Sequence, residues 1–209
     1  LDVFAILFIM LFVAGLSYKI IGIVVLCLIP LAGSFMWYVK QPDPLFLKDY
    51  QQERILSFLY PDEYASTTQY QQDNSVMAIG SGQLFGKGLN NSTLATVKDA
   101  NLISEQQTDF IFSVVGEELG FVGSTLIIVI LGLIVVQCIR TARKASDSNG
   151  MFIATGVATL VGVQTFLNIG VATSLLPNTG IPLPFISYGL SSLVSSCAGM
   201  GLVMNVSLQ

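Results

Sequence analysis

Five segments of this 209-residue chain carry almost no charge and are each about long enough to cross a lipid bilayer. A spanning helix needs about 20 mostly apolar residues, because the hydrocarbon core of a bilayer is about 30 Å thick. The segments lie at 2–17, 20–39, 121–139, 151–173 and 186–206. The pattern predicts an all-α polytopic membrane protein with about five transmembrane helices in this chain.

The composition agrees with a membrane protein and argues against a nucleic-acid partner. Only 11% of the residues are charged, whereas a soluble domain carries about 25%. The net charge of -4 comes without basic clustering of the kind that binds nucleic acid. Cys27, Cys138 and Cys197 are isolated in apolar segments, so their spacing predicts neither a disulfide nor a metal site.

The positive charges predict which loops face outward. Arg140, Arg143 and Lys144 follow the third segment as a compact cluster, which is typical of a cytoplasmic turn. The long loop 40–108 is then extracytoplasmic. Its own lysines oppose this orientation by simple counting, but loops beyond about 60 residues are largely exempt from the rule. Apolar residues at helical spacing predict an amphipathic helix at 48–59, and a second helix is expected near 69–79.

A glycine-rich stretch, A-I-G-S-G-Q-L-F-G-K-G-L, occupies residues 78–89 of the outer loop. Glycines let backbone N–H groups approach an anion, and Lys87 adds a positive charge. The spacing is not that of a Walker loop, since no Ser or Thr follows the lysine. The alternative interpretation is a flexible turn between two surface helices.

Three carboxylates lie where the polar loop runs into the next apolar segment. They are Asp109, Glu117 and Glu118, and the chain contains no histidine, so a carboxylate is the leading candidate for proton transfer. If 109–120 is helical, Asp109 and Glu117 lie within ~80° of each other on one face. The alternative for Asp109 is a stabilising role near a helix N-terminus. Spacing does not choose among the three.

A proline-rich stretch, N-I-G-V-A-T-S-L-L-P-N-T-G-I-P-L-P-F-I-S-Y-G, occupies residues 168–189. Prolines 177, 182 and 184 forbid a continuous helix. Such an apolar, broken hairpin is tolerated at membrane depth only when it is buried in protein or lines a cavity. An ordinary outer hairpin loop is the alternative, and the apolar composition favours packing against a cavity.

The motifs at 78–88, 108–121 and 180–189 resemble, in sequence and in order, those of the SEDS family (shape, elongation, division and sporulation proteins). The likeness covers essentially the whole chain. Family members have about ten spans, so the resemblance implies that this chain corresponds to a C-terminal half, and we expect it to be inactive alone. Two stretches resemble the rod-shape, elongation branch of the family more than the division branch: K-D-Y-Q…R-I at 48–55 and A-I-G-S-G…G-K-G at 78–88.

The resemblance implies a peptidoglycan glycosyltransferase of the bacterial cytoplasmic membrane. Such enzymes polymerise lipid II on the outer side, together with a class B penicillin-binding protein. The family's essential acidic residue corresponds to Asp109, which would act as the general base. A divalent cation is a further candidate for offsetting the diphosphate charge. The residues expected to contact substrate are Lys87, Gly80, Ser81, Gly82, Gly86, Arg54, Glu105 and Glu117.

The chain departs from the family pattern at three places. Residues 104–107 read S-E-Q-Q where Pro-Glu-x-His is usual, and Gln83 and Leu190 each replace a glycine. Asp109 and Lys87 are retained. Intramembrane carboxylates and a broken hairpin also fit a lipid II flippase, and a non-catalytic membrane scaffold for a penicillin-binding protein is a third alternative. The long outer loop favours an outward reaction chamber over a flippase.

Overall fold

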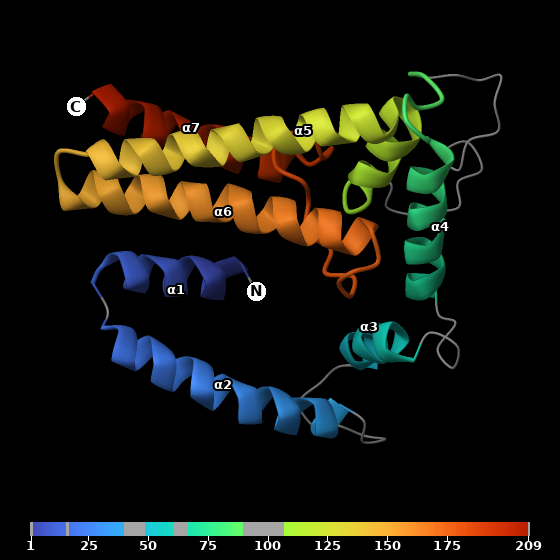
Figure 1. The fold of residues 1–209 in the computed structure, drawn as a ribbon, viewed down its shortest axis with the longest axis horizontal. Coiled ribbons are helices and arrows are strands. Elements are labelled where there is room, and N and C mark those ends of the chain that lie inside the picture. Colours follow the sequence, from blue (N-terminus) through green and yellow to red (C-terminus); the bar gives the residue numbers. More distant parts are fainter. Residues whose placement is uncertain (1, 16, 40–48, 61–66, 90–106, 209) are drawn as a thin grey trace. The chain divides into compact units, whose positions relative to one another are not determined.

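A computed structural model describes residues 2–15, 17–39, 49–60, 67–89 and 107–208 of the chain. Within these ranges the regular structure is entirely helical, which confirms the predicted all-α fold (Figure 1). The helices are α1 (Asp2–Val13), α2 (Tyr18–Val39), α3 (Asp49–Leu59), α4 (Thr67–Ser81), α5 (Ile111–Lys144), α6 (Ser148–Ala172) and α7 (Leu190–Leu208).

Three helices among the described residues, α5, α6 and α7, are long and apolar enough to cross a membrane. The α1 segment Val3–Val13 is apolar but shorter. The 22 residues of α2, which include Pro30, give a helix of spanning length. The chain is thus a helical membrane protein, and the total of five spans stays a prediction.

The helix ends differ from the expected bounds where the backbone turns. α1 ends at Val13, and Gly15 follows with a φ of 91°, a conformation that glycine adopts without steric cost. The third expected span is only part of α5, which already begins at Ile111. The last span begins at Leu190 rather than at residue 186, because the preceding residues belong to the proline-rich loop.

The chain divides into two compact units. The first consists of Leu11–Tyr70, and the second, larger unit consists of Leu1–Met10 together with Gln71–Gln209. In the first of these, α3 confirms the helix predicted at 48–59, and it buries Leu56 and Ser57. The Gln52 side chain donates a hydrogen bond to the Val39 carbonyl at the end of α2.

In the larger unit α5 and α6 lie side by side along their length, and α7 packs against both (Figure 1). Small residues form the core between them, which lets the helix backbones approach closely. Asp147 caps the N-terminus of α6, because its side-chain Oδ1 accepts a hydrogen bond from the Gly150 N–H. All three cysteines are free. The core consists of Cys138, Ala142, Ala154, Ala158 and Val203.

Candidate functional site

α5 is broken at Gly120, whose φ of 66° and ψ of -166° are not helical. In a continuous helix the N–H groups of Phe121 and Val122 would donate to carbonyls four residues earlier. Here Phe121 donates instead to the Gln83 carbonyl at 2.8 Å, and Val122 donates to the Leu84 carbonyl at 3.1 Å. The two N–H groups that lose their helical acceptors therefore find new acceptors in the glycine-rich loop.

The same loop also donates hydrogen bonds to the two carbonyls that the break leaves without helical donors. The Glu117 carbonyl accepts a hydrogen bond from the Lys87 N–H at 2.9 Å, and the Glu118 carbonyl accepts one from the Gly88 N–H at 3.0 Å. Four hydrogen bonds to the loop thus replace two within the helix. Because an unpaired buried backbone group is costly, the break in α5 and the loop stabilise each other.

The loop needs glycine because it touches the backbone of α5. A Cβ atom added to Gly82 would lie 1.9 Å from the Gly116 carbonyl oxygen, and one added to Gly86 would lie 2.2 Å from the Glu118 carbonyl oxygen. Gly86 also has a φ of 78°. By contrast, a Cβ at Gly80 would meet nothing within 4 Å. Of the three glycines predicted to contact substrate, Gly82 and Gly86 therefore allow the loop to pack closely against α5.

The N–H groups of the loop bond to carbonyls of the protein, which argues against the interpretation of the loop as an anion-binding backbone. The Gly82 N–H donates to the Ile79 carbonyl at 3.2 Å, and the Gly86 N–H donates to the Gly82 carbonyl at 2.8 Å. With Lys87 and Gly88 bonded to α5, these N–H groups already have carbonyl acceptors. The loop is an ordered part of the site rather than a flexible turn.

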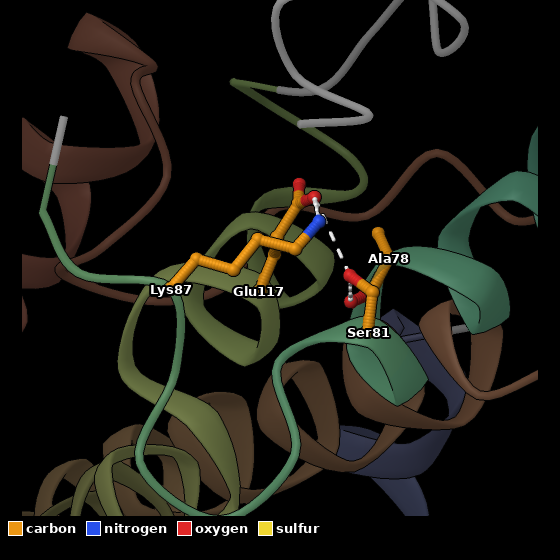
Figure 2. A network of polar contacts seen from close by, with 4 residues as sticks. All are labelled: Ala78, Ser81, Lys87 and Glu117. Atoms are coloured by element: carbon orange, nitrogen blue, oxygen red, sulfur yellow. Dashed lines mark hydrogen bonds and ion pairs between the residues drawn. The ribbon is translucent and has the colours of Figure 1, made fainter. Parts of the chain in front are cut away.

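Lys87 and Glu117, both predicted to contact substrate, form an ion pair with each other (Figure 2). The distance from Lys87 Nζ to Glu117 Oε1 is 2.6 Å, and Glu117 is only 1% exposed. Ser81 Oγ lies 3.4 Å from the same carboxylate oxygen and donates to the Ala78 carbonyl at 2.7 Å. Lysine thereby compensates a buried charge that would be strongly unfavourable alone.

Asp109 lies just before α5, not on it. The helix begins at Ile111, its N-cap residue is Phe110, and no side chain caps it. A helix over 109–120, which would have placed Asp109 and Glu117 on one face, therefore does not form. Ser113 Oγ instead donates to the Phe110 carbonyl at 2.6 Å. Asp109 is half-buried.

The proline-rich loop and α6 hold the segment that carries Asp109. Asn168 Nδ2 donates to the Asp109 carbonyl at 2.8 Å, and Ser187 Oγ donates to the carbonyl of residue 108 at 2.7 Å. The Tyr188 N–H donates to the carbonyl of residue 107 at 2.8 Å. Sequence reasoning missed these anchors, although Asn168 and Ser187 lie within the motif that it singled out.

The proline-rich loop is folded into the protein. Leu183 is fully buried and belongs to a cluster formed with α5 and α6. This packing agrees with the interpretation of the motif as a buried turn rather than an ordinary outer hairpin. The other buried members of the cluster are Phe112, Leu131 and Ala172.

An apolar groove of about 570 Å³ runs between α5 and α6. One end is formed by Leu175 and Leu176 of the loop after α6, and Leu176 packs against the cluster formed by Val171 and Phe110, the residue after Asp109. The groove therefore ends beside the Asp109 segment. Three glycines line it: Gly132 on α5, with Gly162 and Gly170 on α6.

Contact with substrate stays a prediction for all of the predicted site residues. Arg54 lies on α3 in the other unit, so its grouping with Lys87 remains a prediction. Glu105 lies outside the described residues. Within the described ranges, no group of three or more His, Cys, Asp or Glu side chains is placed to hold a metal ion. The divalent cation also remains a prediction.

A family model for cell cycle proteins, named for FtsW, RodA and SpoVE, matches residues 1–209. The chain is 40% identical over 199 residues to a probable peptidoglycan glycosyltransferase FtsW of Geobacter metallireducens, covering 95% of this chain and 49% of that protein. It is 40% identical over 199 residues to stage V sporulation protein E of Bacillus subtilis, covering 95% and 51%. It is 35% identical over 196 residues to peptidoglycan glycosyltransferase MrdB of Escherichia coli, covering 94% and 50%.

Among solved structures, the chain resembles one described as "Structural coordination of polymerization and crosslinking by a peptidoglycan synthase complex". The TM-score is 0.73 and the sequences are 29% identical, over 99% of this chain and 54% of that one. The chain spans about half the length of the curated relatives it matches. The names of these relatives refer to peptidoglycan glycosyltransferase activity and to sporulation, so the elongation branch remains a prediction.

Proposed function

The chain belongs to the FtsW, RodA and SpoVE family of cell cycle proteins, and from this premise we propose that the protein is a peptidoglycan glycosyltransferase that polymerises lipid II. Two relatives named for that activity, at 40% and 35% identity, support the proposal. The observation that carries it is the position of Asp109, which is held at the end of an apolar groove.

The reaction needs one base. A sugar hydroxyl attacks the anomeric carbon of lipid II, a new C–O bond forms, and the bond to the lipid diphosphate breaks. Diphosphate leaves without an acid, while the proton of the attacking hydroxyl passes to a carboxylate. Glu117 is buried and paired with Lys87, whereas Asp109 is half-buried in the segment before α5. Asp109 is therefore the better candidate for the base.

The apolar groove between α5 and α6 is suited to the lipid tail. Its lining is almost entirely hydrocarbon, and one end reaches Leu176, which packs against the cluster of Phe110 and Val171. A tail in this groove would place its diphosphate at the same end as Asp109. Lys87, Arg54 or a divalent cation would then offset the phosphate charge.

We place the protein in the bacterial cytoplasmic membrane, with several spans and the Asp109 site on the outer face. The solved relative belongs to a complex described as coordinating polymerization and crosslinking. This description supports a class B penicillin-binding protein as the partner. A flippase would need polar side chains lining a path through the membrane, and the Asn168 amide, a polar group within a span, instead donates to two backbone carbonyls.

The test is Asp109→Asn in the full-length protein, assayed with purified lipid II. Asparagine is nearly isosteric but accepts no proton, so the polymerisation rate should fall by about 10²–10⁴-fold. Glu118→Gln is the matched control for loss of a neighbouring carboxylate, and it should retain most of the activity. If Asp109→Asn polymerises at the wild-type rate while Glu118→Gln is folded and inactive, the base is Glu118.

A further inference from the structure

Asn168 uses both N–H bonds of its amide to join two segments to α6. Its Nδ2 donates to the Asp109 carbonyl and to the Ile181 carbonyl, each at 2.8 Å. The residue is 1% exposed, and its Oδ1 is buried with no hydrogen-bond partner among the described residues. Because both partners are acceptors, they fix which end of the amide faces them.

Ser187 makes a second link of the same kind. Its Oγ donates to the Thr108 carbonyl at 2.7 Å and accepts a hydrogen bond from the Leu183 N–H, also at 2.7 Å. The hydroxyl thereby joins the proline-rich loop to the residue before Asp109. Ser187 is 7% exposed, so water competes little for these bonds.

Three consecutive carbonyls, those of residues 107, 108 and 109, are thus held by three donors: the Tyr188 N–H, Ser187 Oγ and Asn168 Nδ2. We call these donors the carbonyl clamp. We infer that Asn168 and Ser187 are positioning residues that set the place of the Asp109 carboxylate against the reacting sugar. The inference rests on the proposed function. Neither residue is proposed to contact the substrate.

The need for a clamp follows from the local structure. Asp109 precedes the first residue of α5, so helical hydrogen bonds do not fix its backbone. A displacement of about 1 Å at a catalytic group can cost about 10²-fold in rate. The clamp supplies the missing restraint through main-chain carbonyls.

The first measurement is steady-state kinetics of Ser187→Ala in the full-length protein. This change removes one atom and both Ser187 bonds, so kcat should fall by about tenfold to hundredfold, while KM for lipid II changes by less than about threefold. Ser195→Ala is the control, since this exposed hydroxyl donates to the Ser192 carbonyl within α7. Unchanged kcat in Ser187→Ala would overturn the inference.

Combining Ser187→Ala with Asp109→Asn tests whether Ser187 acts through Asp109. A positioning role predicts that Ser187→Ala lowers the residual rate of Asp109→Asn by no more than about twofold, because the group being positioned is already lost. A full additional loss would show a general structural role and would overturn the inference. Asn168→Asp, which replaces an N–H donor with an acceptor, should behave in the same way with a larger loss of kcat.

A readout without activity separates the clamp from the proposed function. A nitroxide attached to Asp109→Cys, in a background without the native cysteines, reports the mobility of the segment. Adding Ser187→Ala should raise this mobility, whereas adding Ser195→Ala should not. Unchanged mobility overturns the clamp. Raised mobility supports it even if Asp109→Asn proves active, in which case the base assignment fails and the clamp stands.

Discussion

Lys87 and Glu117 lie 30 residues apart in the sequence, yet their side chains meet in an ion pair of 2.6 Å. The pair joins the glycine-rich loop to α5 at the same place as the backbone bonds across Gly120. Glu117 is 1% exposed, so its charge is separated from water and depends on this lysine. The ion pair therefore links the stability of the loop to a residue that sequence reasoning assigned to substrate.

Replacing Lys87 alone should destabilise the protein. Lys87→Met leaves the buried Glu117 carboxylate without its cation, and breaking a buried pair in this way costs about 3–5 kcal/mol. The double variant Lys87→Met with Glu117→Gln removes both charges and should recover most of that loss. Denaturant unfolding of the full-length protein in detergent measures both variants. Equal stability of the single and double variants would contradict a dependence of Glu117 on Lys87.

The double variant also tests whether Lys87 contacts phosphate. Its charges are gone but its fold is retained, so any remaining rise in KM for lipid II reports a lost contact with substrate. A charge-assisted hydrogen bond contributes about 1.5–3 kcal/mol, which is roughly a tenfold to hundredfold rise in KM. The Glu117→Gln single variant, which keeps the lysine, is the control. An unchanged KM in the stable double variant would make Lys87 a purely structural residue.

Two neighbouring glycines should respond oppositely to alanine. In Gly82→Ala the added methyl group would lie 1.9 Å from the Gly116 carbonyl oxygen, so the loop must move away from α5. Overpacking of this kind costs about 1–3 kcal/mol. In Gly80→Ala the methyl group meets open space on α4, and stability should be unchanged or slightly higher. Thermal unfolding of both variants in one detergent checks this contrast, and equal melting temperatures would refute it.

The sequence allowed prediction of the features that depend on local pattern. The apolar segments and the helices at 48–59 and 69–79 follow from periodicity, and α3 and α4 appear there. The break at Gly120 did not follow, because a glycine inside an apolar segment also fits a continuous helix. It becomes necessary only when the loop at Gln83 and Leu84 supplies new acceptors.

The contacts that define the site join residues far apart in sequence, and no local pattern encodes them. Asn168 and Asp109 are 59 positions apart, and Ser187 and Thr108 are 79 apart. Asn168 looked like a polar residue within a span, and only the folded chain shows its amide on two carbonyls. The candidate base, by contrast, could be predicted because its motif resembles that of a known family.

Cysteine labelling in intact cells should reveal which side of the membrane the site faces. In a background without the native cysteines, Leu89→Cys lies on the exposed end of the glycine-rich loop and should react with an impermeant thiol reagent. Ser146→Cys, exposed in the turn between α5 and α6, should react only after the cells are opened. The reverse pattern would place the Asp109 site inside and would exclude polymerisation on the outer face.

Filling the groove between α5 and α6 should weaken the use of lipid II without weakening the fold. A Cβ atom added at Gly132 meets no other atom within 4 Å, so we expect Gly132→Leu to be tolerated and to project into the groove that Gly132 lines. Gly201→Leu makes the same change in open space on α7, outside the groove, and is the matched control.

If the lipid tail occupies this groove, the new leucine displaces two or three of its methylene groups. Each buried methylene contributes about 0.8 kcal/mol, so KM for lipid II should rise roughly tenfold or more in Gly132→Leu and stay unchanged in Gly201→Leu. A lipid II analogue with a short tail should be less sensitive to the change, because it reaches less of the groove. An equal effect on long and short tails would show that the groove near Gly132 does not hold the lipid.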